Sequence, residues 1–95
     1  MKLVTIVCEA YAKDSVTKLL REVGAQGYTL FPVEGDGSRG KRPADIPEFA
    51  NIQIEVIVPP AVAEQLLEAL GRELFARYAM VAFESDVRVL RPQKF

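Results

Sequence analysis

One stretch of the chain, residues 34–49, gathers the groups best suited to hold an anion. Gly35, Gly37 and Gly40 let the backbone approach a ligand closely, and successive amide groups in such turns form concave anion sites. The hydroxyl and cationic side chains of this stretch, which can donate to an anion, are Ser38, Arg39, Lys41 and Arg42. Because an arginine fork matches two oxygens of an oxyanion at once, the stretch suits a phosphate or bicarbonate.

The same stretch separates two apolar segments that are predicted to be antiparallel strands. Connections of that kind usually have about 2–5 residues, so this one is several times longer than usual, which favours a functional loop. The alternative is a solvated hairpin whose glycines serve only flexibility. A P-loop and a Rossmann turn are excluded, because the segment leads into a strand and lacks the Gly-Lys-Ser/Thr ending. No magnesium site with a positioned nucleophile stands out, so we expect binding and not phosphoryl transfer.

Composition narrows the function further. The sequence has no histidine and a single cysteine, Cys8, which lies in an apolar run typical of a buried thiol. The absence of histidine excludes Ser-His-Asp and Cys-His nucleophiles and removes the commonest nitrogen ligand of zinc. A net charge of −1 lacks the basic excess of a nucleic-acid binder. Because these residue types are missing, we expect neither an enzyme nor a metalloprotein. Without a signal-peptide pattern or a membrane-spanning stretch, we expect a reduced cytoplasmic protein.

The elements that position the loop follow from the periodicity of apolar residues. The clearest strand is 51–58, where Ile52, Ile54, Val56 and Val58 alternate with mostly polar neighbours. The patterns predict further strands at 2–8, 28–33 and 80–90, and helices at 12–23 and 60–75. Gly24 is the expected stop of the first helix, and Pro60 suits the first turn of the second.

The resulting order, βαββαβ, predicts an α+β, ferredoxin-like fold with a four-stranded antiparallel sheet, as one domain over residues 1–95. Two helices can cover only one face of such a sheet. The other face is expected to carry Thr5, Ile57, Ala82 and their neighbours, which is too apolar to remain solvated. The pattern therefore predicts self-association, without a stoichiometry.

Several segments resemble the PII-like signalling family, and in particular its carboxysome-associated, SbtB-like branch. The run Gly24-Ala25-Gln26-Gly27-Tyr28-Thr29 is followed by Gly35-Asp36-Gly37-Ser38-Arg39 and then by Arg42. The segments Ala50–Glu55 and Arg77–Val81 resemble the same branch, so the similarity extends from Leu3 to Leu90.

The resemblance implies a trimer that binds AMP, ADP or ATP in clefts between subunits. Residues 34–49 would be the T-loop, which orders over the phosphates and presents a surface to a partner. The nucleotide-binding residues that it implies are Tyr28, Thr29, Gly35, Gly37, Ser38, Arg39, Arg42, Ala79, Met80 and Val81. Bicarbonate, if it is also sensed, would bind near Glu9, Asp36, Gly37, Ser38 and Arg39.

The resemblance also implies a signalling role in the uptake or fixation of inorganic carbon. The partner would be a bicarbonate transporter or a carboxysome-related protein. Some features of the wider family are missing. The T-loop has no tyrosine that could be uridylylated, no glycine-rich B-loop precedes the last strand, and the tail lacks the paired cysteines of a redox switch.

Other interpretations of the same residues remain open. Glu9 could be a solvated acid at a strand end, and Tyr28 and Thr29 could serve strand packing only. An ACT-like or CutA-like module for a small molecule or metal would share the topology. An acylphosphatase-type enzyme would too, but Glu9-Ala10-Tyr11-Ala12 stands where that family has its signature loop.

Overall fold

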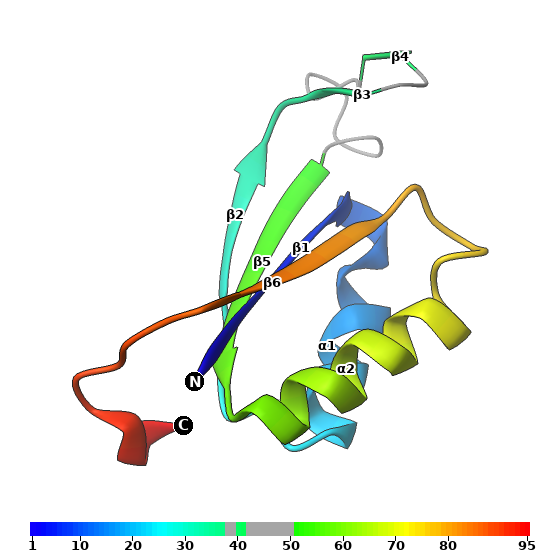
Figure 1. Cartoon of the computed structure of the whole chain (residues 1–95). Coiled ribbons are helices and arrows are strands. Elements are labelled where there is room, and N and C mark those ends of the chain that lie inside the picture. Colours follow the sequence, from blue (N-terminus) through cyan, green and yellow to red (C-terminus); the bar gives the residue numbers. More distant parts are fainter. Residues whose placement is uncertain (38–39, 42–50) are drawn as a thin grey trace.

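The computed structural model describes residues 1–37, 40–41 and 51–95. Its elements follow the predicted order, with one short additional pair of strands between the second and third predicted strands. They are β1 (Lys2–Glu9), α1 (Lys13–Glu22), β2 (Thr29–Val33), β3 (Asp36–Gly37), β4 (Gly40–Lys41), β5 (Asn51–Val58), α2 (Pro60–Glu73) and β6 (Val81–Asp86). The ferredoxin-like prediction is confirmed, and β3 and β4 lie beyond the ends of β2 and β5 (Figure 1).

The main sheet has the strand order β2-β5-β1-β6, with every neighbouring pair antiparallel. The central strand β1 pairs with β5 from Lys2↔Val58 to Glu9↔Asn51, and with β6 from Lys2↔Asp86 to Val7↔Val81. Strands β2 and β6 are therefore the two edges of the sheet. Consecutive residues point to opposite faces, and directly paired residues share a face, so this register assigns each side chain to one face.

Both helices pack on the same face of the sheet (Figure 1). That face is made by Val4, Ile6 and Cys8 of β1 and by the alternating apolar residues of β5, all of which are buried. The helices and the residues that directly flank them contribute most of the other core side chains: Ala12, Val16, Leu19, Leu20, Ala63, Leu66, Ala69, Leu70 and Leu74. The predicted burial of the Cys8 thiol is confirmed.

The first helix ends as the sequence predicts. Gly24 has a φ of 87°, a conformation that is costly for any residue with a side chain. The amide of Gly24 donates to the carbonyl of Arg21, and the amide of Ala25 donates to that of Leu20. These two bonds form a Schellman motif, which satisfies the last carbonyl groups of α1 and turns the chain toward β2.

The other face of the sheet, which no helix covers, is called the open face below. It carries Val81 and Phe83 of β6, whose side chains are 53% and 57% exposed in this chain. Ile57 lies on it as predicted, whereas the assignment of Ala82 to this face is wrong. Ala82 pairs with Ile6, a core residue, and packs against the helix-covered core. A frame error of one residue in an edge strand moves a side chain to the opposite face.

The last strand is shorter than the predicted 80–90. It ends at Asp86, because Asp86 pairs with Lys2, the first residue of β1, and the sheet offers no partner beyond it. Lys2 Nζ lies 2.6 Å from Asp86 Oδ1, and this contact raises the pKa of Lys2 and lowers that of Asp86. One further backbone bond joins the amide of Val87 to the carbonyl of Met1. Neither described helix is long and apolar enough to cross a bilayer.

Candidate functional site

One end of the sheet brings together the bases of the long loop and the end of β1. Val33, the last residue of β2, pairs with Asn51, the first residue of β5, and Asn51 pairs with Glu9 at the end of β1. The three residues form one row across three neighbouring strands. Residues 34–50 leave and re-enter the sheet at this row, so Glu9 lies beside the base of the predicted anion-binding loop.

The carboxylate of Glu9 joins this row to a segment that is distant in sequence. Glu9 Oε2 accepts a hydrogen bond of 2.9 Å from the backbone amide of Ala79, 70 residues away. The same oxygen accepts a bond of 3.2 Å from the hydroxyl of Tyr11. The other oxygen, Oε1, is buried and has no hydrogen-bond donor among the described residues. Two residues that the sequence assigned to the site, Glu9 and Ala79, are therefore in direct contact.

Aromatic side chains surround this contact. The rings of Tyr11 and Tyr78 lie 5.7 Å apart at an angle of 54°. The guanidinium of Arg77 lies 5.1 Å from the centre of the Tyr78 ring and donates to the Tyr78 hydroxyl, which also lies 3.3 Å from Ser15 Oγ. Partial desolvation of the hydroxyl, together with the neighbouring carboxylate of Glu9, raises the pKa of Tyr11. The hydrogen bond between Tyr11 and Glu9 was not predicted from the sequence.

The predicted residues at the start of β6 divide between the two faces. Met80 is buried in the core beneath the helices, whereas Val81 lies on the open face. Ala79 and Met80 belong to no helix or strand, so this segment forms the approach from α2 to β6. Only the neighbours of Met80, and not its own side chain, are available to a ligand in this arrangement.

The other half of the predicted base site lies at the opposite edge of the sheet. Thr29 is the first residue of β2, and Tyr28, just before it, is 46% exposed. Thr29 pairs with Glu55 of β5, and β1 then separates β5 from β6. With neighbouring strands about 4.8 Å apart, the β2 and β6 edges are separated by roughly 14 Å. Within one chain, Tyr28 and Thr29 therefore do not enclose a single base together with Ala79 and Val81.

The predicted phosphate-binding residues are placed only in part. Gly35 is exposed and follows β2, and the backbone of Asp36 and Gly37 forms β3, paired with Gly40–Lys41. Ser38, Arg39 and Arg42 lie outside the described residues. Within residues 1–37, 40–41 and 51–95, no group of three or more His, Cys, Asp or Glu side chains is arranged to hold a metal ion.

Comparison with known proteins connects this arrangement to a signalling family. The family model for nitrogen regulatory protein P-II matches residues 1–94. A PII-like signalling protein from Thermus thermophilus is 41% identical, with a TM-score of 0.86 over 99% of this chain and 93% of that chain. CPII, a nitrogen regulatory PII-like protein from Thiomonas intermedia K12 bound to ADP, AMP and bicarbonate, is 33% identical, with a TM-score of 0.90 over 99% and 92%. The apo form of CPII is 28% identical, with a TM-score of 0.74 over 93% and 89%.

Proposed function

The chain belongs to the nitrogen regulatory protein P-II family, and from this premise we propose that it senses adenine nucleotides in clefts between the subunits of a trimer. PII proteins are signalling regulators and not enzymes, and CPII has been solved with ADP and AMP bound. The proposal gives this chain AMP, ADP or ATP as its regulatory ligand and requires no metal or other cofactor.

The position of the predicted base-binding residues on two opposite edges carries the proposal. Tyr28 and Thr29 lie at the β2 edge, while Ala79 and Val81 lie at the β6 edge. A neighbouring copy that packs its open face against this one would bring the β2 edge of one subunit toward the β6 edge of the next. The cleft between them would then hold the base and ribose, as no cleft within one chain could.

The phosphates of the nucleotide would bind to the long loop. In this proposal the amides of Gly35 and Gly37, the hydroxyl of Ser38 and the guanidinium groups of Arg39 and Arg42 surround the phosphate oxygens. The proposal assigns Ser38, Arg39 and Arg42 to the phosphate site because of their chemistry and their position in the sequence. These charge-assisted bonds would offset the conformational entropy that the loop loses on ordering. That loss costs about 1–2 kcal/mol per ordered residue.

Bicarbonate is the second ligand that we propose for the same end of the sheet. CPII, which is similar over nearly the whole chain, has been solved with ADP and bicarbonate together. The proposed residues are Asp36, Gly37, Ser38 and Arg39, with Glu9 beside them at the end of β1. Because a carboxylate repels an anion, Glu9 would act on bicarbonate only through the surrounding segment.

Signalling would follow from a difference in partner affinity between the liganded and unliganded loop, which is the requirement for any ligand-driven switch. We propose a cytoplasmic role, where adenine nucleotides report the energy state of the cell. The partner that fits the bicarbonate proposal is a bicarbonate transporter or a carboxysome-related protein.

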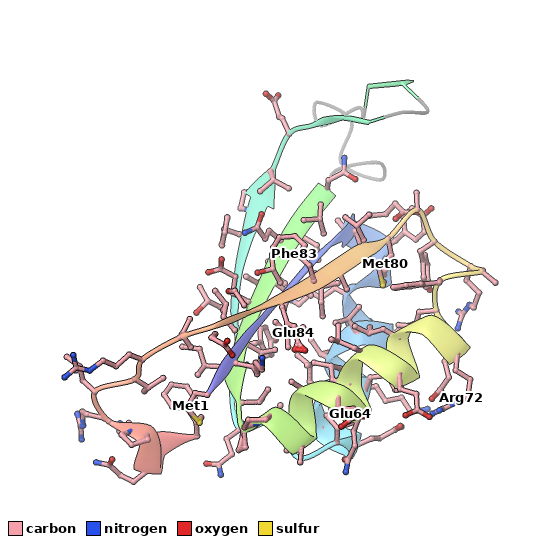
Figure 2. All side chains as sticks on the ribbon, viewed as in Figure 1. Met1, Glu64, Arg72, Met80, Phe83 and Glu84 are labelled. Carbon is pink, nitrogen blue, oxygen red and sulfur yellow. The ribbon has the colours of Figure 1, made fainter. Side chains whose placement is uncertain are left out.

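Calorimetric titration of AMP, ADP and ATP into the wild type and an Arg39→Ala variant tests the phosphate site. Loss of a charge-assisted hydrogen bond is worth roughly 1.5–3 kcal/mol, so we expect the affinity to fall by about tenfold to a hundredfold. Arg72→Ala is the matched control, because Arg72 lies on the outer surface of α2 with 61% of its side chain exposed (Figure 2). Equal affinities in the two variants would remove Arg39 from the site.

A further inference from the structure

The contact between Glu9 and Ala79 has a geometric consequence for the proposed cleft. Ala79 lies between α2 and β6, in a segment that no helix or sheet ladder fixes at that residue. A 2.9 Å hydrogen bond from its amide to Glu9 Oε2 ties this segment to the end of β1, a central strand of the sheet. The rigid part of the molecule thus sets the position of a segment that approaches β6.

The surroundings of the carboxylate support a role in holding the segment more than a role in contacting a ligand. Oε2 already accepts two hydrogen bonds, from Ala79 and from Tyr11. Oε1 is buried, so it offers no surface to a ligand in this conformation.

We propose that Glu9 is a positioning residue of the nucleotide cleft: by accepting the Ala79 amide, its carboxylate fixes the Ala79–Val81 segment in the conformation that receives the base. This inference rests on the proposed function and deepens it. What positions the segment is the ability of the Glu9 oxygen to accept a hydrogen bond. The negative charge of the carboxylate is not required. Glu9 lies in one row with Val33 and Asn51, between which the long loop runs. Its contact with Ala79 therefore connects the base of that loop directly to the base-binding edge.

The acceptor and the charge are separated by Glu9→Gln and Glu9→Ala. Glutamine keeps an oxygen that can accept the Ala79 amide and removes the charge, whereas alanine removes both. Tyr11→Phe is the matched control, because it deletes the second hydrogen bond to the same oxygen and leaves the bond to Ala79. Thermal melting of each variant, followed by circular dichroism, identifies any variant that is not folded.

Two measurements are needed on each variant: the hydrogen-exchange rate of the Ala79 amide without nucleotide, and the affinity for ADP. In Glu9→Ala we expect Ala79 to exchange about tenfold faster and ADP to bind about tenfold more weakly, as for the loss of one ordinary hydrogen bond. Glu9→Gln and Tyr11→Phe should remain within about threefold of the wild type in both measurements.

The outcomes distinguish this inference from the proposed function. If Glu9→Gln loses as much ADP affinity as Glu9→Ala, the charge is what matters and the positioning role is wrong. The positioning role is also wrong if Glu9→Ala leaves both measurements unchanged, or if Tyr11→Phe weakens ADP binding as much as Glu9→Ala. If the wild type binds no adenine nucleotide, the proposed function fails, and the exchange rate of Ala79 alone then shows whether Glu9 holds the segment.

Discussion

The two faces of the main sheet come from the same four strands, yet their surroundings differ completely. On the helix-covered face, Ile6 and Ile54 have no exposed area, and every neighbour that covers them belongs to this chain. On the open face, Val81 and Phe83 remain more than half exposed, and polar side chains lie between the apolar ones. There Gln53 Nε2 donates to Glu55 Oε2 at 3.2 Å.

This difference separates the part of the molecule that folds one chain from the part that remains available to others. A continuous apolar layer beneath two helices supplies the burial that a domain needs. The open face, with an apolar edge at β6 and a polar middle, is suited to an interface between subunits and to a ligand at its border.

Two isoleucines of β5 on opposite faces allow the most direct test. Ile54 is fully buried beneath the helices, whereas Ile57 lies half-buried on the open face. We expect Ile54→Ala to lower the free energy of unfolding by about 3–4 kcal/mol, since the deletion leaves a cavity in a packed core. Ile57→Ala should lower it by less than half as much in urea unfolding at low protein concentration. Equal losses at every concentration would contradict the division of the two faces.

The apolar edge of the open face is tested by Phe83→Lys. Phe83 pairs with Thr5, and the next residue, Glu84, lies on the opposite side of the strand (Figure 2). A lysine in a packed interface should weaken association by about 2 kcal/mol or more per interface, as for a lost hot-spot residue. The chain itself should remain folded, because Phe83 is 57% exposed and lies outside the helix-covered core. Mass measured by light scattering after size exclusion gives the result.

A control with the same new charge belongs with that experiment. Gln65 is exposed on α2, on the helix side of the molecule, so Gln65→Lys adds a lysine far from the open face. We expect it to retain the oligomeric mass of the wild type. If Phe83→Lys retains that mass as well, β6 does not contribute to the interface and the proposed intersubunit cleft loses its basis.

Much of the helix-covered side could be predicted from sequence because its signals are local. The alternation from Ile52 to Val58 identified β5 and its buried face, and Gly24 marked the end of α1. Each of these signals depends on residues within a few positions of one another, where the periods of helix and strand apply directly.

The open face and the site depend on register and on contacts between distant residues, which are not local. The assignment of Ala82 was wrong because the sequence does not show which residues of β6 oppose β1. The contact between Glu9 and Ala79 spans 70 residues and requires both the register and the path from α2 to β6. The separation of Tyr28 and Thr29 from Ala79 and Val81 likewise follows from the strand order, which motif spacing does not contain.

The helix layer can be tested by replacing each of two glycines with alanine. We expect the two replacements to change the free energy of unfolding in opposite directions. A Cβ at Gly24 or at Gly71 would meet no atom within 4 Å, so steric crowding affects neither. Gly24→Ala forces a side chain into a φ of 87° and should destabilise the protein by about 1 kcal/mol or slightly more. Gly71→Ala, within α2, should stabilise it by about 0.5–1 kcal/mol, because alanine loses less entropy in a helix. Denaturant unfolding of both variants measures the two changes in the free energy of unfolding. If both changes have the same sign, the Schellman turn at Gly24 does not determine where α1 ends.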